Sequence, residues 1–244
     1  MEDFYTPHII SNPIDRLISY LTRRWLPIFG IGFGGLIVLP FLAPILMKLG
    51  LSGPANLIYF IYSFLCHQLP ERSFFLFGPQ TMYSLEELGR AGADTTHMFT
   101  LRKFIGSSDI GWKVAWSDRM VWMYTSMWVF GMLWRPWLSK IKRLPWWGLL
   151  IFLLPMAVDG TSHFISDLAG IGQGFRADNA WLAELTGYAF STSFYTGDAL
   201  GSFNSIMRLL SGVLFGLGVI WFIFPYLEET IPRSGHRGNA QFVK

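Results

Sequence analysis

Residues 26–47 form a long run without a single charged side chain, and this run limits the possible folds of the chain more than any other feature. A helix needs about 20 apolar residues to cross the hydrocarbon core of a bilayer, so the run predicts a membrane span. Only 14% of all residues are charged and 52% are hydrophobic, whereas soluble domains carry about 25% charged residues. We therefore expect an integral membrane protein.

The next apolar segment allows two interpretations. Residues 49–70 contain no Asp, Glu, Lys or Arg, but Ser52, Gly53 and Pro54 weaken the beginning of a helix. The segment is either a second spanning helix that ends near Gln68 or a half-buried helix that does not cross.

Three later segments complete the predicted bundle. They are residues 120–134, residues 145–167 and residues 209–227. The first of them is short, but Arg119 and Arg135 flank it and it is rich in tryptophan, which favours the membrane interface. The predicted fold is all-α: a polytopic membrane helix bundle with four or five transmembrane helices.

Two long polar excursions interrupt the bundle at residues 71–118 and 168–204. They hold too many aromatic residues for solvated linkers, and unstructured loops of this length are uncommon in compact domains. We expect two ordered loops, packed on each other or on a partner, with short helices at Ser84–Gly89 and Thr100–Ile105. The predicted division of the chain is a polar N-terminal segment 1–25, a membrane domain 26–228 and a disordered tail 229–244.

Small residues predict where the helices approach one another closely. Gly30, Gly34 and Gly35 lie within the first span, and Gly212 and Gly216 form a GxxxG pattern in the last. Glycines at such spacing let two helix backbones pack against each other in a membrane.

Polar residues gather at the ends of the predicted spans. Successive spans run in opposite directions, so these residues reach the same membrane surface in either topology. Opposite charges in a low-dielectric setting should find each other, so we expect Arg119 or Arg208 to pair with Asp159 or Asp167, and His163 to hydrogen-bond in the same group. The predicted structural polar cluster consists of Cys66, His67, Arg72, Arg119, Asp159, His163, Asp167, Asn204 and Arg208.

The basic residues indicate which side this surface faces. The short loop 135–144 on the opposite side carries Arg135, Lys140, Lys142 and Arg143. Short basic loops stay cytoplasmic, so the polar cluster is expected on the outer side.

Asp159, His163 and Asp167 have the spacing i, i+4, i+8, which places them on one stripe of a helix. Such a stripe could bind a metal ion, or a carboxylate could orient the imidazole. A helix that simply leaves the bilayer, with a hydrogen-bonded histidine at the interface, explains the same pattern.

The other polar residues are also ambiguous. Cys66 is the single cysteine, which excludes an internal disulfide, and its neighbour His67 would point about 100° away from it on a helix. Cys66 is therefore predicted to be a small apolar filler. Arg72, Arg119 and Arg208 could form an anion site for phospholipid or phosphate headgroups, or they could be ordinary interfacial arginines.

The stretch that begins at Cys66 resembles a sequence motif of a known family. Cys66-His67-Gln68, followed by Arg72-Ser73-Phe74, resembles the opening motif of the DUF2085 family of uncharacterised prokaryotic membrane proteins. The third family motif resembles Asp159-Gly160, and the last, Asn-x-x-x-Arg-x-x-x-Gly, resembles the run from Asn204 to Gly212. The resemblance covers about residues 55–220 and implies a membrane protein of a prokaryotic cell.

The second family motif, Cys-x-Arg-Cys-x-Gly-x-Tyr, is only partly present. Arg119 and Tyr124 match, but Ser117 and Met120 stand where the motif has its cysteines. The cysteine pattern of the family would look like a metal or redox site, and Ser117 is a poor ligand. The resemblance therefore implies a family member without that site.

The functional prediction is a non-catalytic accessory or scaffold subunit of a larger membrane assembly, in contact with membrane lipids and other membrane protein subunits. The alternative is a metal-dependent membrane enzyme that acts on a lipid or phosphate ester, with the metal ion held by Asp159, His163 and Asp167. The sequence names no cofactor. Its net charge of +3 is small and its basic residues are scattered, so no nucleic acid partner is expected.

Overall fold

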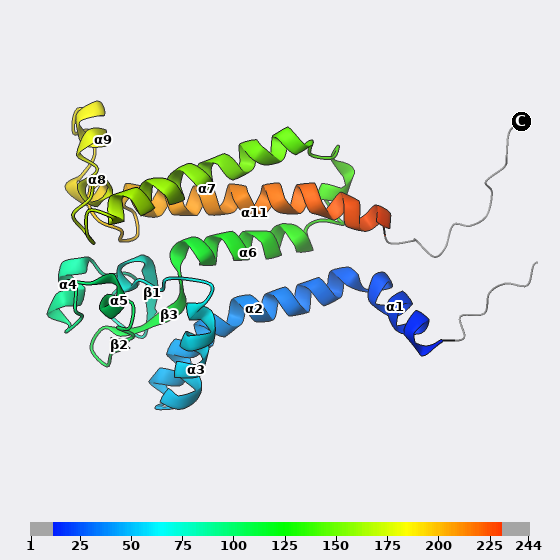
Figure 1. Ribbon diagram of the computed structural model, residues 1–244, viewed down its shortest axis with the longest axis horizontal. Helices are drawn as coiled ribbons and strands as arrows, with labels where there is room; N and C mark the ends of the chain where they lie inside the picture. Colours follow the sequence, from blue (N-terminus) through cyan, green and yellow to red (C-terminus); the bar gives the residue numbers. More distant parts are fainter. Residues whose placement is uncertain (1–11, 231–244) are drawn as a thin grey trace, which may run out of the picture.

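The computed structural model describes residues 12–230, and four of its helices lie side by side as a bundle (Figure 1). These are α2 (Trp25–Lys48), α6 (Asp118–Met132), α7 (Trp146–Asp167) and α11 (Phe203–Thr230). Within the described residues α2, α7 and α11 are long and apolar enough to cross a membrane. The described part of the protein is thus mostly helical with three candidate spans, as expected for a polytopic helical protein, and the predicted number of four or five spans is not confirmed.

Most of the smaller elements lie together at one end of the bundle, and we call them the cap (Figure 1). The first loop supplies β1, α4, α5, β2 and β3, and the second loop supplies α8, α9 and α10. The opposite end of the bundle holds the α6–α7 connection and α1. The bounds of the remaining elements are α1 Pro13–Arg23, α4 Leu85–Arg90, α5 Met98–Leu101, η2 Leu138–Lys140, α8 Phe175–Asp178, α9 Ala180–Leu185 and α10 Thr192–Tyr195.

The segment 49–70 forms one short helix, α3 (Ser52–Ser63), followed by an irregular stretch. Its 12 residues rise about 18 Å, which is less than the hydrocarbon thickness of about 30 Å. α3 is therefore too short to cross by itself, which agrees with the alternative of a half-buried helix. The hydroxyl of Tyr59 donates to the Lys113 carbonyl, and that of Tyr62 donates to the Leu36 carbonyl over 2.7 Å, which fixes α3 to the cap and to α2.

The first loop contains a small antiparallel sheet, so the prediction of an all-α fold is wrong in this part. Its strands are β1 (Ser73–Leu76), β2 (Gly106–Ser107) and β3 (Gly111–Ser117), in the order β1-β3-β2. Strands usually reveal themselves by alternating buried and exposed residues, but residues 113–116 of β3 are all buried. The alternation that would have predicted β3 is therefore absent. β3 continues directly into α6, because Ser117 ends the strand and Asp118 begins the helix.

Both loops are ordered, and they contact each other. A capping box at Ser84 and Glu87 starts α4 close to the predicted position. Ile171 of the second loop packs against a core cluster in the first loop that includes Leu88 and Leu101. Residues 1–11 and 231–244 lie outside the described part of the chain. The predicted C-terminal tail 229–244 therefore falls mostly outside it, and its first two residues belong to α11.

The GxxxG glycines allow α6 and α11 to cross closely. A Cβ atom added to Gly212 would lie 3.1 Å from the Met123 amide nitrogen, and one added to Gly216 would collide with Ser126. The Ser126 hydroxyl donates to the Met123 carbonyl and lies within hydrogen-bond reach of the Gly212 carbonyl. The contact between α6 and α11 therefore depends on small residues on both helices.

We expect Gly216→Ala to destabilise the folded protein by about 1–3 kcal/mol, because the added methyl group overpacks the crossing. Gly35→Ala is the control, since nothing lies within 4 Å of a Cβ atom there, and it should leave the unfolding midpoint unchanged or slightly raised. Thermal unfolding in detergent measures both variants. Equal midpoints for the two variants would contradict the close crossing.

Candidate functional site

An ion-pair network joins the helix ends on the cap side of the bundle. Four arginines and four aspartates of the described chain take part, and their formal charges cancel. They are Arg72, Arg119, Arg176, Arg208, Asp118, Asp159, Asp167 and Asp198.

Asp159 links α6, α7 and α8. Its Oδ2 accepts a hydrogen bond from Nη2 of Arg119 and its Oδ1 accepts one from Nη2 of Arg176, each over 2.7 Å. The predicted ion pair between Arg119 and Asp159 is therefore present. Both oxygens of a carboxylate that is only 6% exposed are engaged by guanidinium groups.

Arg208 connects the start of α11 to the start of α6 and to the second loop. Its Nε donates to both carboxylate oxygens of Asp118 over 2.8 Å, and its Nη1 donates to Asp198 over 2.5 Å. Arg208 and Asp118 are 1% and 0% exposed. A pair this deeply buried depends on both partners, because either charge alone would be poorly solvated.

Arg72 brings the first loop onto α7. Its two terminal nitrogens donate to the two oxygens of Asp167 over 2.7 Å, and its Nε donates to Asp198 over 3.0 Å. Burial raises the pKa of the Asp198 carboxyl, but the charges of Arg72 and Arg208 outweigh burial and hold that pKa well below its usual range. Asp198 is therefore ionised and binds both loops together.

Sequence reasoning missed three members of the network: Asp118, Arg176 and Asp198. Arg176 and Asp198 come from the second loop, which carried no periodic pattern to place them. Charge balance was the available signal, because the sequence cluster had three arginines against two aspartates. Because charged residues of a membrane protein usually pair with one another, an excess of arginine in the cluster predicts further carboxylates nearby.

His163 is 3% exposed and its ring nitrogens have different surroundings. Nε2 lies 3.2 Å from Nη2 of Arg176. Arginine only donates hydrogen bonds, so Nε2 is the acceptor, the ring is neutral and Nδ1 carries the proton. His163 thus hydrogen-bonds within the cluster as expected, while its Nδ1 has no partner among the described residues.

The stripe Asp159, His163 and Asp167 is not arranged as a metal site. The carboxylates of Asp159 and Asp167 are held by arginines, and a metal ion at the same oxygens would face those positive charges. Within residues 12–230 no group of three His, Cys, Asp or Glu side chains is placed to hold a metal ion.

Cys66, His67 and Asn204 lie beside the network. Cys66 is buried and free, and its Sγ lies 3.4 Å from the Ser117 hydroxyl. Ser117 stands where the DUF2085 motif that this stretch resembles has a cysteine. The His67 side chain is exposed. Asn204 holds the second loop, since its Nδ2 donates to the carbonyls of Arg176 and Gly197 over 2.7 and 2.9 Å.

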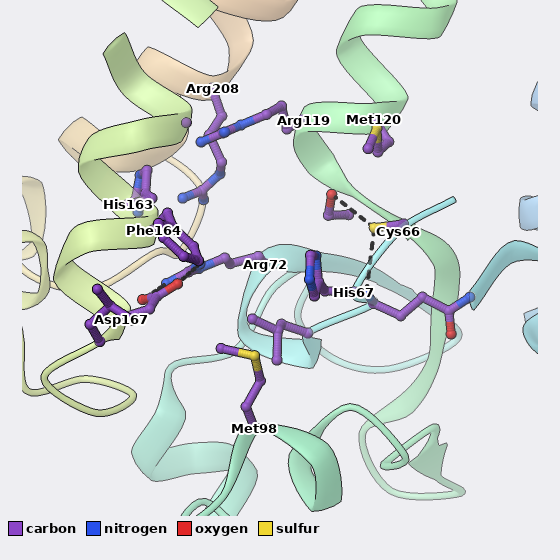
Figure 2. A pocket seen from close by; sticks show the side chains of 15 residues that line it. Cys66, His67, Arg72, Met98, Arg119, Met120, His163, Phe164, Asp167 and Arg208 are labelled. Atoms are coloured by element: carbon purple, nitrogen blue, oxygen red, sulfur yellow. Dashed lines mark hydrogen bonds and ion pairs between the residues drawn. The ribbon is translucent and has the colours of Figure 1, made fainter. Parts of the chain in front are cut away.

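A cavity of about 300 Å³ lies between these elements (Figure 2). It is bounded by the stretch 66–69, Arg72, the beginnings of α6 and α11, and the end of α7. Most of the predicted cluster lines it. The exceptions are Asp159, which is bound to Arg119 in the network, and Asn204. The lining residues of the predicted cluster are Cys66, His67, Arg72, Arg119, His163, Asp167 and Arg208.

Two further charged residues are buried under the cap. Glu71 lies in the turn η1 (Pro70–Arg72), 4% exposed, and its carboxylate oxygens have no partner among the described residues. Lys113 of β3 is fully buried and donates to the carbonyls of Gln68 and Arg102. Burial raises the pKa of Glu71 to about 7 and lowers the pKa of Lys113 to about 7.

These shifts predict a minimum of stability near neutral pH. Between the ordinary value of 4.5 and about 7, folded Glu71 binds more protons than unfolded Glu71, so the free energy of unfolding falls as pH rises. Between about 7 and 10.5, unfolded Lys113 binds more protons than folded Lys113, so that free energy rises again. Glu71→Gln should remove the fall between pH 5 and 7, which amounts to at most about 3 kcal/mol.

Thermal unfolding in detergent at pH 5, 7 and 9 measures this effect. The control is Glu86→Gln, since the Glu86 side chain is 80% exposed, and it should keep the wild-type profile. If the wild type and Glu71→Gln fall equally between pH 5 and 7, Glu71 is not the titrating group.

Comparison with known proteins gives a distant relative. The chain is 28% identical over 177 residues to the uncharacterized protein MJ1492 of Methanocaldococcus jannaschii, and the alignment covers 71% of this chain and 70% of the relative. No protein-family model matches the chain, so the resemblance to DUF2085 is not confirmed, although an uncharacterised prokaryotic family is compatible with the relative. No solved structure matches.

Proposed function

We propose that the protein is a non-catalytic accessory or scaffold subunit of a larger assembly in the cell membrane of a prokaryote. The cap would present a fixed surface to other subunits at the membrane surface, and the ion-pair network would hold that surface on the helix ends.

The observation that carries the proposal is an exposed apolar patch on the second loop. Leu185, Tyr188 and Phe190 lie within six positions of each other and are 77%, 69% and 53% exposed. They belong to the cap, on and just after α9 (Figure 1). Apolar side chains gathered on a surface mark sites of contact with proteins or membranes.

The state of the carboxylates supports a role without catalysis. A carboxylate that acts as a general base or metal ligand needs an oxygen available to substrate or metal. The oxygens of Asp118, Asp159, Asp167 and Asp198 are engaged by arginines. The metal-dependent enzyme on a lipid or phosphate ester is therefore the less favoured alternative.

The arrangement of helices supports a four-span topology. α6 has only 15 residues, but it lies alongside the three longer helices (Figure 1). With α2, α6, α7 and α11 crossing, the cap lies on one side, and α1 and the loop 135–144 lie on the other. Arg23 and Arg24 would then join the basic loop, and the excess of positive charge on that side supports a cytoplasmic position for it and an outer position for the cap.

Purification from native membranes in a mild detergent tests the proposal. The wild type should co-purify with another membrane subunit in fixed stoichiometry, measured by size exclusion and mass spectrometry. Leu185→Ser combined with Tyr188→Ser should lose that subunit and keep the wild-type unfolding midpoint, because both side chains are largely exposed. The matched control is Phe99→Ser, which changes an exposed side chain of the first loop and should retain the subunit. A wild type that purifies alone, or a double variant that retains the subunit, overturns the proposal.

A further inference from the structure

The helix α1 has an apolar face that the rest of the described chain leaves largely uncovered. Its four members follow the spacing i, i+3, i+4 and i+7, which places them on one side of a helix. They are Ile14, Leu17, Ile18 and Leu21, and they are 61%, 56%, 52% and 44% exposed. Apolar side chains gathered on one face mark a site of contact with a protein or a membrane.

The opposite face of α1 is basic. Arg16 and Arg23 lie seven positions apart, so they share one side of the helix, and both are exposed. Arg24 follows directly after the helix. Asp15 is the one acidic residue of the stretch 12–24, so this stretch has a formal charge of +2, from three arginines against one aspartate. The charge favours an anionic partner.

α1 lies directly beside the end of a candidate span. It ends at Arg23, α2 begins at Trp25, and α2 is long and apolar enough to cross a membrane. Figure 1 shows that α1 bends away from the axis of α2 at the end of the bundle opposite the cap. A helix that leaves a span in this direction runs along the membrane surface, where an amphipathic helix can place its apolar face in the lipid.

Exposed tryptophans mark the same level on the neighbouring segment. Trp137 lies in the connection from α6 to α7, and Trp146 and Trp147 begin α7. They are 70%, 69% and 56% exposed, and tryptophan is enriched at the interface between membrane and water. The guanidinium carbon of Arg135, in the same connection, lies 6.0 Å from the centre of the Trp25 ring. The tryptophans therefore belong to a segment that adjoins the junction of α1 and α2.

We propose that α1 binds in the headgroup layer of an anionic membrane leaflet. Its isoleucine and leucine side chains face the acyl chains, and Arg16 and Arg23 lie among the lipid phosphates. Binding of this kind becomes stronger with the apolar area buried and with the negative charge of the lipids. A lipid surface is the favoured occupant, because the membrane around α2 reaches the apolar face of α1 without any further component. The proposal concerns the end of the bundle opposite the cap and does not depend on the proposed contacts with other subunits.

Hydrogen–deuterium exchange of the full-length protein in nanodiscs tests the proposal. Each nanodisc holds one copy of the purified protein, so neither a second copy nor another subunit can cover α1. The lipid is phosphatidylcholine alone or phosphatidylcholine mixed with phosphatidylglycerol. We expect the α1 amides to exchange about 25-fold more slowly in the mixture, since each of two net positive charges near an anionic surface contributes about fivefold. Equal exchange in the two lipids would show that acyl chains or the chain's own segments alone cover α1, and it overturns the proposal.

A variant of the apolar face tests the contact with the acyl chains. Leu17→Gln combined with Leu21→Gln removes two of its four side chains, and it should raise the exchange rate of the α1 amides about tenfold or more in both lipids. Glutamine has nearly the helix propensity of leucine, and both positions are exposed, so the change acts on the apolar face alone. Wild-type exchange in this variant overturns the proposal.

A second variant tests the basic face. Arg16→Gln combined with Arg23→Gln should lose most of the difference between the two lipids, because it removes the charge that the phosphates attract. The matched control is Arg90→Gln combined with Lys103→Gln, which removes two positive charges from exposed positions in the cap and should keep the wild-type difference. If the arginine variant of α1 also keeps that difference, the basic face does not bind anionic lipid and the proposal is wrong.

Discussion

Replacing Asp118 with alanine should destabilise the folded protein by about 3–5 kcal/mol, because it leaves the Arg208 guanidinium buried without its main partner. Nε of Arg208 donates to both oxygens of Asp118, and neither residue is more than 1% exposed. Chemical unfolding in detergent measures the loss, and a fall in the yield of monodisperse protein should accompany it.

Two comparisons separate this pair from ordinary surface charges. Glu86→Ala breaks the pair of Glu86 with Arg90, whose side chains are 80% and 68% exposed, and should change the free energy of unfolding by less than about 0.5 kcal/mol. The double variant Asp118→Leu with Arg208→Met should recover part of the lost stability, because well-packed apolar residues can replace a buried pair. Recovery should be incomplete, since Asp198 also loses Arg208 and keeps Arg72. If Asp118→Ala is as stable as Glu86→Ala, the pair does not hold α6 to α11.

Replacing Asp159 with alanine should have an effect at least as large, since one carboxylate there serves two guanidinium groups. Arg119 and Arg176 would both lose the carboxylate with which they form their ion pair in the described part of the chain. The expected loss is again about 3–5 kcal/mol or more, seen as a lower yield of folded protein and a lower unfolding midpoint.

Asp109→Ala is the matched control for Asp159→Ala, because Asp109 is exposed and lies in the first loop away from the network. It should keep the wild-type yield and midpoint. A normal yield of stable Asp159→Ala protein that had lost a chemical activity would instead support the enzymatic alternative.

The sequence predicted the long helices well because their signal is local. An uncharged run such as that in α2 or α11 needs no knowledge of its neighbours, and the GxxxG pattern at Gly212 and Gly216 identified the face that meets α6. The converging helix ends followed from the alternating directions of the spans. These inferences depend on the bilayer as a solvent more than on tertiary contacts.

The missing parts depend on contacts between distant segments. Residues 113–116 of the central strand β3 are all buried, so no alternation of buried and exposed residues marked the strand. Asp198 joins Arg72 to Arg208 across more than a hundred positions of sequence, and nothing near Asp198 predicts that. The sequence likewise could not show that the donors of Arg72 and Arg208 are used on aspartates, because most of these aspartates lie in distant segments.

The direct continuation of β3 into α6 gives the small sheet control over a helix of the bundle. Ser73 of β1 pairs with Ser117, the last residue of β3, and Asp118 follows at once as the first residue of α6. Inserting one residue between that pairing and the helix would turn α6 by about 100° and carry Asp118 away from Arg208. Strand register in the cap therefore sets the rotation of α6 in the bundle.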